Sequence, residues 1–450
     1  MKKVNGVTDE QIAEFRRSFD GDALAKVAQN AVSNSELSTV SLRRDLIQDT
    51  DFSFSTKLDE WRVTNQRRSG RCWLFATLNL FRVGAMKKMN VNNFEFSQAH
   101  IHFWDKLERA NHFLEAMLET ADRPIDDRTI HFLLSDPIGD GGQWNMAMNL
   151  ISKHGLVPMS AYPESQSSSS TRPMNNVLKD ILRSTACEIR GVLEDGGSDE
   201  DARKHKDARM KEIWKILCIH LGTPPEKFDW QWRDKDNEFH RKGEMTPLEF
   251  VEEYVDVDWE SYVCIVNDPR NEYYRTYTVD YLQNVSGGPP VEYLNIPSEE
   301  MKAITQNLLE DGIPVWMGCD VGKQMERKKG LWDAELYDLK GLYGIKFGME
   351  KADRLRFGQT MMTHAMLFTG VDVVDGNPRR WRVENSWGSE ESGVKGFYTM
   401  NDNWYDEHMF EIAAPRDYLT EKMRRGLEGD AIVLPAWDPM GSLAKDEALF

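Results

Sequence analysis

The segment Gln66-Arg-Arg-Ser-Gly-Arg-Cys-Trp73 ends an irregular polar loop and leads directly into a helical pattern. The apolar residues that follow recur at helical spacing and are Leu74, Phe75, Leu78 and Phe81. They predict a helix that begins near Cys72 and runs toward Met89. Cys72 would then lie in the first turn, where the helix dipole stabilises a thiolate. An isolated cysteine is usually an inert buried residue, so its role depends on motifs elsewhere in the chain.

Two further motifs lie in the later part of the chain. Thr363-His-Ala-Met-Leu-Phe-Thr-Gly370 has the composition of a β-strand, and His364 stands at its start. Val383-Glu-Asn-Ser-Trp-Gly388 follows it. A lone strand histidine is usually packed or solvated, and Asn-Ser-Trp-Gly alone is a weak motif. The order Gln, Cys, His, Asn along one chain makes the combination specific, because four matches in sequence rarely arise by chance.

In this order the motifs resemble the active-site segments of papain-like cysteine peptidases. The resemblance implies Cys72 as the nucleophile and His364 as the general base. Asn385 would hold the imidazole in position by a hydrogen bond, and Trp387 would shield that bond from water. Gln66 and the backbone N–H of Cys72 would form the oxyanion hole, whose fixed donors stabilise the developing negative charge.

A glycine pair, Gly141-Gly142, resembles the segment whose backbone lies beside bound peptide in these enzymes. Glycine lets a peptide backbone approach closely, although an ordinary turn before the next helix would also use it. The pair is therefore the candidate substrate-binding segment.

Among papain-like peptidases, the chain most resembles the bleomycin hydrolase and aminopeptidase C family. That family typically has Ser-Gly-Arg-Cys-Trp around the nucleophile, as this chain has at 69–73. Cys72 and His364 lie much further apart than the roughly 130–150 residues of small papain-like enzymes, so a large insertion separates them. Other similar segments run along nearly the whole chain and are Phe94-Glu-Phe-Ser-Gln98, Phe103-Trp-Asp-Lys106, Asp140-Gly-Gly-Gln-Trp144, Val266-Asn-Asp-Pro-Arg270, Gly318-Cys-Asp-Val-Gly-Lys323 and Leu434-Pro-Ala-Trp-Asp-Pro-Met-Gly441.

The fold that this resemblance implies is α+β. It is the papain-like cysteine peptidase fold, with a helical left half and a β-rich right half, enlarged by a large, mainly helical insertion and by N- and C-terminal extensions. The expected parts are an N-terminal helical extension (1–58), the helical half with the nucleophile (59–160), the inserted mainly helical region (161–295), the β-rich half with His and Asn (296–425) and a C-terminal arm that enters the active-site cleft (426–450).

Members of the family form ring-shaped homohexamers, and the carboxylate that ends their C-terminal arm receives the substrate's N-terminal amine. The resemblance therefore implies an aminopeptidase that acts on peptides, with amide hydrolysis of the bleomycin hydrolase type. Here the usual ending, Met440-Gly-Ser-Leu-Ala444, is followed by Lys445-Asp-Glu-Ala-Leu-Phe450. We expect self-trimming near Ala444 or Lys445, because an unprocessed tail would overfill the cleft.

Composition argues against several other classes of protein. The 74 acidic and 56 basic residues give a formal charge of −18, which repels phosphate backbones and disfavours nucleic acid as a partner. No apolar run has the length of a secretion signal or a membrane span. The five cysteines are scattered without a close pair, which fits a reducing cytoplasm rather than a disulfide or zinc framework. No metal or organic cofactor is implied.

Three alternatives remain open at this point. A nucleic-acid-binding regulatory protein could use Arg67, Arg68 and Arg71 or the stretch 204–211, and would show steeply salt-dependent binding. A transglutaminase-like acyl transferase shares the Cys and His chemistry but usually has an aspartate where Asn385 stands. An endopeptidase would result if the C-terminal arm does not cap the cleft.

Overall fold

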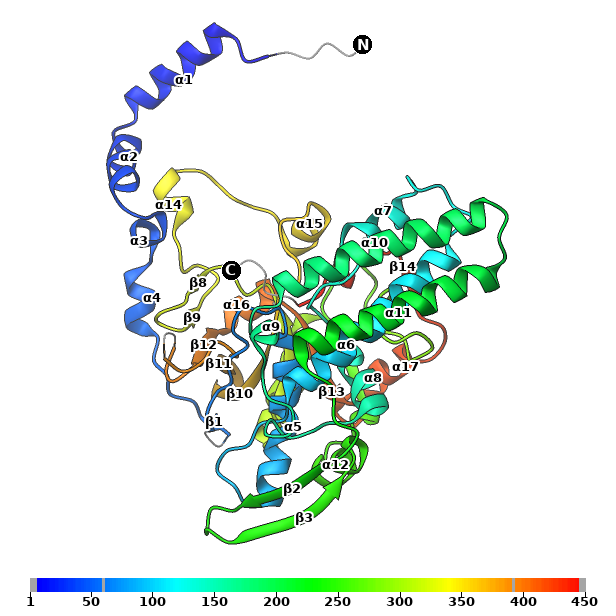
Figure 1. Cartoon of the computed structure of the whole chain (residues 1–450). Helices are drawn as coiled ribbons and strands as arrows, with labels where there is room; N and C mark the ends of the chain where they lie inside the picture. Colours follow the sequence, from blue (N-terminus) through cyan, green and yellow to red (C-terminus); the bar gives the residue numbers. More distant parts are fainter. Residues whose placement is uncertain (1–5, 59–60, 391–392, 445–450) are drawn as a thin grey trace.

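One large sheet lies at the centre of this computed structural model, whose described residues are 6–58, 61–390 and 393–444 (Figure 1). Within those residues its strands run, from one edge to the other, in the order β14 (Ile432–Leu434), β5 (Arg275–Val279), β6 (Glu292–Asn295), β4 (Tyr262–Val266), β13 (Met409–Pro415), β7 (Val315–Cys319), β10 (His364–Val374), β11 (Asn377–Glu384), β12 (Phe397–Asn401), β9 (Leu331–Trp332) and β8 (Met325–Glu326). The short strand β1 (Thr56–Lys57) pairs with β10 outside this order.

The two faces of the sheet pack against different helices, as the alternation of side chains along β10 shows. Ala365 and Leu367 belong to the hydrophobic cluster that contains α5 (Cys72–Met89) and α8 (Trp144–His154). Met366 and Phe368 point the other way, into the cluster with α13 (Ser298–Glu310) and α16 (Asp402–His408). The sheet therefore separates two cores, and α5 lies against the first.

Helix α5 begins at Cys72 and ends at Met89, as the apolar spacing predicted. Asn90, in the left-handed conformation at φ 55°, ends it. Most of its residues are buried, because sheet strands and neighbouring helices surround it. Two further helices follow α5 along the chain and are α6 (Gln98–Glu119) and α7 (Arg128–Ser135).

A pair of long helices, α10 (Arg172–Glu194) and α11 (Asp199–Leu221), packs on α6 and forms a third cluster with it (Figure 1). The short helix α9 (Gln166–Ser169) precedes this pair, and the hairpin of β2 (Phe228–Arg233) and β3 (Phe239–Met245) with helix α12 (Pro247–Tyr254) follows it. The range 161–295 is not helical throughout, because its last part supplies β4, β5 and β6 to the central sheet. The run Val263–Val266 is apolar and buried, which favours a central strand over a helix.

The N-terminal extension consists of helices that run along one side of the molecule and then away from it (Figure 1). They are α1 (Asp9–Gly21), α2 (Ala23–Asn34), α3 (Leu37–Ser41) and α4 (Arg44–Asp49). A capping box begins α1: Gln11 N–H donates to Thr8 Oγ1, and Thr8 N–H donates to Gln11 Oε1. Neither α1 nor α2 has a buried residue.

Short elements connect the rest of the chain and are α14 (Leu339–Tyr343), α15 (Lys351–Arg356), α17 (Glu421–Gly426), η1 (Trp259–Ser261), η2 (Arg416–Tyr418) and η3 (Pro439–Gly441). No helix in the described part of the chain combines the length and the hydrophobicity that a bilayer-spanning segment requires.

Candidate active site

Cys72 is the first residue of α5 and is fully buried. The residue before it, Arg71, is also buried, and its guanidinium forms a bidentate ion pair with Glu164, both N–O distances being 2.9 Å. This fork geometry fixes the loop that precedes the helix. The Cys72 thiol therefore lies at a rigid helix N-terminus, where the backbone dipole favours the thiolate.

Gln66 is fully buried in the same loop and is tied to the strand-rich half of the fold. Its backbone N–H donates to the Ser386 carbonyl oxygen at 2.8 Å, and Ser386 Oγ donates to Gln66 Oε1 at 2.5 Å. One Nε2 hydrogen is donated to the Ser69 carbonyl oxygen at 2.8 Å. An amide nitrogen carries two donors, so the second can serve an oxyanion beside Cys72.

His364 begins β10, where its backbone pairs with Cys319 of β7. Its Nε2 lies 2.9 Å from Asn385 Oδ1, so the histidine and asparagine predicted from the sequence are in direct contact. The ring of Trp387 packs on the imidazole with a centroid distance of 5.1 Å. With Nε2 engaged by Asn385, Nδ1 is the nitrogen that can exchange a proton with a nucleophile.

The strands and helix bring these residues to one place in the fold. Helix α5 packs along β10, and Cys72 shares a packed cluster with Ala365, the residue after His364. Asn385 follows directly after the end of β11, which is hydrogen-bonded to β10. The site therefore forms where the N-terminus of a helix meets the ends of two strands.

The glycine pair lies beside Cys72 and is held by Asp140. The Asp140 carboxylate accepts hydrogen bonds from Lys106 Nζ at 2.6 Å and from the Gly70 N–H at 3.1 Å. Burial alone would raise the pKa of Asp140, but the Lys106 ammonium and the hydrogen bonds hold it well below its ordinary value. A charged carboxylate thus joins the glycine segment to the nucleophile loop.

Gly142 pairs with Ala444 of the C-terminal arm in an antiparallel bridge. A Cβ on Gly142 would come within 2.4 Å of the Trp73 ring, so only glycine fits here. The Ala444 carbonyl oxygen lies 3.3 Å from Cys72 Sγ. The described part of the arm therefore occupies the cleft as a peptide would.

The arm is also anchored before Ala444. Gln143 Nε2 donates to the Ser442 carbonyl oxygen at 2.7 Å, and Ser442 Oγ donates to the Met362 carbonyl oxygen at 2.8 Å. Ala444 itself is fully buried. Lys445, predicted as the other residue at the trimming point, lies outside the described residues.

Sequence reasoning did not identify the groups that support the site. Ser386 and Glu384 flank Asn385 in the motif already singled out, so the motif itself contained that signal. Glu384 forms a buried ion pair with Arg82 of α5 at 2.6 Å and accepts a hydrogen bond from Trp61 Nε1 at 2.7 Å. Burial raises the pKa of Glu384, and Arg82 opposes that rise. Only the folded chain reveals this link between α5 and β11.

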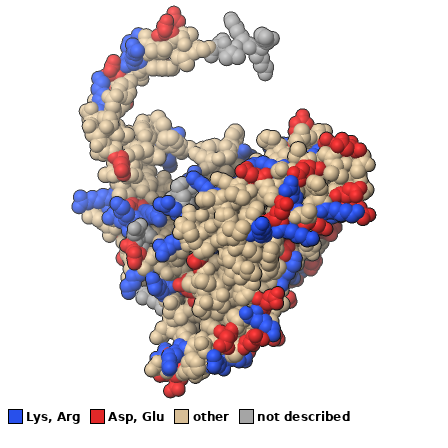
Figure 2. Space-filling model, viewed as in Figure 1, with Lys and Arg blue, Asp and Glu red and all other residues tan. Residues whose placement is uncertain are grey.

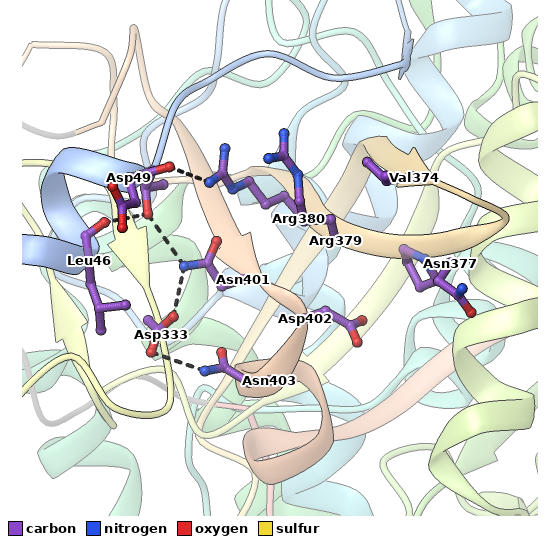
Figure 3. Close-up of a pocket in the computed structure, with 12 residues that line it drawn as sticks. Leu46, Asp49, Asp333, Val374, Asn377, Arg379, Arg380, Asn401, Asp402 and Asn403 are labelled. Atoms are coloured by element: carbon purple, nitrogen blue, oxygen red, sulfur yellow. Dashed lines mark hydrogen bonds between the residues drawn. The ribbon is translucent and has the colours of Figure 1, made fainter.

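A surface pocket of about 470 Å³ lies elsewhere, between α4, the β10–β11 hairpin and the end of β12 (Figure 3). None of the predicted catalytic or substrate-binding residues lines it. Its polar groups bond one another: Arg380 donates to the Asp49 carbonyl oxygen at 2.5 Å, and Asn401 donates to Asp333 at 2.8 Å. The pocket is best explained as the joint between the N-terminal extension and the sheet.

A cysteine at a helix N-terminus, a histidine–asparagine pair at strand ends and a glycine segment beside the chain's own C-terminal arm are the arrangement expected of a papain-like cysteine peptidase. The Peptidase C1-like family model matches residues 6–441. The chain belongs to this family, within the group of cysteine peptidases that includes bleomycin hydrolase and aminopeptidase C.

Individual relatives are similar over nearly their whole length. Bleomycin hydrolase of Homo sapiens is 41% identical, covering 98% of this chain and 99% of that protein. Aminopeptidase C of Lactobacillus delbrueckii subsp. lactis is 38% identical, also covering 98% of this chain and 99% of that protein. The crystal structure of PepW from Lactobacillus rhamnosis HN001 superposes with a TM-score of 0.96 at 39% identity, covering 98% of this chain and 99% of that one.

Proposed function

We propose that the chain is a cysteine aminopeptidase, which removes N-terminal residues from peptides through an acyl-enzyme intermediate. The observation that carries the proposal is the position of the C-terminal arm, whose Ala444 carbonyl oxygen lies 3.3 Å from Cys72 Sγ. A cleft already filled on one side of the nucleophile leaves little room for residues before the scissile bond. The relatives named aminopeptidase C support the same activity.

The chemistry is a two-step acyl transfer. The Cys72 thiolate attacks the substrate carbonyl carbon, and the oxyanion that forms accepts hydrogen bonds from Gln66 Nε2 and the Cys72 backbone N–H. The His364 imidazolium gives its proton to the departing amine as the C–N bond breaks. His364 then takes a proton from water, whose oxygen attacks the thioester carbon. The C–S bond breaks, the carboxylic acid product leaves, and the Cys72 thiolate and His364 imidazolium are restored.

Asn385 and Trp387 act on His364 rather than on the substrate. The hydrogen bond from Asn385 fixes the orientation of the imidazole ring, and Trp387 keeps water from that bond. Gly141 and Gly142 hold the substrate backbone. The Gly142–Ala444 bridge is the kind of backbone pairing that the substrate would make.

The residues after Ala444 raise the question of where the terminal carboxylate lies. In this proposal the enzyme trims its own tail near Ala444 or Lys445, and the new carboxylate receives the substrate's ammonium. Intact mass of the active enzyme is expected to show loss of the last five or six residues of the sequence. Fully active enzyme that retains Phe450 would contradict trimming.

The relatives named bleomycin hydrolase support hydrolysis of small amides as a second reaction of the same site. The same thiolate would attack an amide carbon in either case, so no additional group is needed. The working compartment we propose is the cytoplasm. No disulfide joins Cys187, Cys218 or Cys264 in the structure, which suits a reducing environment.

We also propose that the chain assembles as a homohexamer, with peptides rather than nucleic acid as its other partners. Helices α1 and α2 expose large apolar side chains, with Phe15, Leu24 and Val27 being 59%, 81% and 66% exposed. A second copy of the chain would cover them. Light scattering is expected to give a hexamer, and a Leu24→Asp, Val27→Asp variant a smaller species. A monomeric wild type at micromolar concentration would contradict the assembly.

The activity is tested with wild type and Cys72→Ser on aminoacyl amides of a fluorogenic amine, with and without an N-terminal acetyl group. Cleavage only of the free-amine substrates, lost in Cys72→Ser, is expected. Equal cleavage of acetylated substrates would indicate an endopeptidase instead. Residual activity in Cys72→Ser would overturn the proposed nucleophile.

A further inference from the structure

A turn of three consecutive cations, Arg327, Lys328 and Lys329, joins β8 to β9 at the edge of the sheet. All three are exposed, and no ion pair within the described chain includes any of them. The turn is firmly held: Lys329 N–H donates to Glu326 Oε2 at 2.5 Å, and the Gly330 carbonyl oxygen accepts from Thr399 N–H at 2.8 Å. Figure 2 shows Lys and Arg side chains gathered at the left of the body, at the level of β8 and β9 in Figure 1.

Arg327 is distinguished from its neighbours by its contact with the active site. Its guanidinium carbon lies 4.6 Å from the centroid of the Trp387 ring. Trp387 packs in turn on His364, at 5.1 Å between ring centroids. A planar guanidinium stacked on an aromatic ring keeps its N–H donors at the edge, where they can bind a carboxylate in bidentate fashion.

The C-terminal arm and Trp387 pack in different hydrophobic clusters. Met440, Leu443 and Ala444 of the arm pack in the cluster that contains Cys72 and α8. Trp387 packs in the cluster on the opposite face of the sheet. A substrate bound in the direction of the arm has its residues before the scissile bond beside Gly142. A leaving part that continues past Cys72 and over His364 would reach Trp387, which packs on His364, and then Arg327.

The sequence of the chain's own tail complements these cations. The residues after Ala444 are Lys445-Asp-Glu, so cleavage after Ala444 or Lys445 would put two acidic side chains on the leaving part. A chain with 74 acidic and 56 basic residues otherwise offers a negative surface to an anionic leaving group. The three exposed cations, of which Arg327 contacts Trp387, are a local exception to that charge balance.

We propose that Arg327 is a specificity-determining residue that binds a carboxylate on the leaving part of the substrate. This inference rests on the proposed peptidase function and adds the substrate class. Peptides with a carboxylate one residue after the scissile bond are preferred over neutral ones. In a dipeptide that carboxylate is the C-terminus, and in a longer peptide it is an acidic side chain.

The test compares kcat/KM for Ala-Ala with that for Ala-Ala amide, and Ala-Asp amide with Ala-Asn amide. The first ratio reports the terminal carboxylate and the second the side-chain carboxylate. Wild type is expected to favour at least one carboxylate substrate about three- to tenfold at low salt, the range for a partly exposed charge-assisted pair. The preference should shrink in high salt, because screening weakens exposed charge pairs.

Three variants separate Arg327 from general positive charge. Arg327→Gln is expected to bring the ratio close to one, whereas Arg327→Lys should retain part of it, because the charge remains but the stacked fork is lost. Lys328→Gln is the matched control, removing an adjacent exposed charge that has no contact with Trp387, and should keep the wild-type ratio. The proposal would be overturned if wild type gave a kcat/KM ratio of one for both substrate pairs. It would also be overturned if Arg327→Gln kept the wild-type ratios.

A neutral aminoacyl coumarin amide distinguishes this inference from the function on which it rests. If wild type cleaves the coumarin amide and both dipeptide forms equally, the aminopeptidase stands and the carboxylate site fails. If wild type cleaves none of these free-amine substrates, the proposed function fails and the inference fails with it.

Discussion

Gln66 occupies its place in the active-site loop through bonds to Ser69 on one side and Ser386 on the other. The same Ser386 donates its backbone N–H to Asn385 Oδ1 at 2.8 Å, so the proposed oxyanion donor and the proposed histidine-orienting residue share a neighbour. Asn385 in turn contacts His364. A displacement of one of these residues is therefore transmitted to the others.

Replacing Gln66 with alanine is expected to lower kcat about 10²–10³-fold with a small change in KM, the usual cost of losing one oxyanion donor. The donor acts mainly in the transition state, so ground-state binding changes little. Steady-state kinetics on a free-amine peptide measures the effect. Arg68→Ala is the control, because Arg68 is an exposed residue of the same loop, and an equal loss there would show that the loop itself had collapsed.

At the scale of secondary-structure elements, α5 begins at the proposed nucleophile Cys72 and β11 ends just before Asn385, so the proposed chemistry requires a fixed relative position of the two elements. The buried pair of Arg82 and Glu384 joins them, with Asn79 Nδ2 donating to the same carboxylate at 3.1 Å. Both charged side chains are almost wholly buried. The pair therefore fixes the position of α5 on the sheet, because separating the two charges would leave each one buried without its counter-charge.

Arg82→Met is expected to lower the free energy of unfolding by about 3–5 kcal/mol, because it leaves the Glu384 carboxylate buried without its counter-charge. The double variant Arg82→Met, Glu384→Gln should recover much of that loss. Urea denaturation followed by tryptophan fluorescence measures both. A double variant as unstable as the single one would show that the ion pair is not what couples the two elements.

Strand β13 contains a buried carboxyl group, Glu411, whose pKa lies well above its ordinary value. Burial raises the pKa of Glu411 from 4.5 to about 8, and its Oε1 has no hydrogen-bond partner in the described chain. The folded protein therefore holds a proton there between about pH 4.5 and 8, while the unfolded chain has lost it. The stability that this proton contributes is complete below pH 4.5 and is lost as the pH rises through 8.

Glu411→Gln is expected to gain stability relative to wild type as the pH rises from 5 to 8, by up to about 1.4 kcal/mol per pH unit, because glutamine cannot ionise. Denaturant midpoints at several pH values measure the difference. Glu428→Gln, at an exposed position, should show no such trend. A constant difference between Glu411→Gln and wild type across this range would refute the buried titration.

At the scale of the whole molecule, local patterns in the sequence predicted elements better than their arrangement. The apolar spacing after Cys72 gave both ends of α5, and the strand composition of 363–370 corresponds to the first part of β10. The order of strands in the sheet could not be predicted, because neighbours such as β13 and β7 come from distant segments. The resemblance, rather than periodicity, indicated an arm in the cleft.

For the candidate site too, local motifs could be predicted from the sequence, whereas the spatial arrangement could not. The residue types and their order predicted Cys72, His364, Asn385 and Gln66 as candidate residues, since each motif is local. The buried role of Asp140 could not be read from sequence, because its partners Lys106 and Asn175 lie on separate helices. The position of Arg327 could not be read from the sequence either, because its contact with Trp387 depends on how β8 and β9 join the sheet.

In the proposed function, the C-terminal arm restricts a cysteine peptidase to N-terminal residues. The most direct measurement compares the full chain with a variant ending at Gly441 on one peptide, with its N-terminus free or acetylated. The full chain should cleave only the free peptide, one residue at a time. The truncated enzyme should also cleave the acetylated peptide internally, in a reaction abolished by Cys72→Ser. A truncated enzyme that still requires a free amine would show that the arm does not set this restriction.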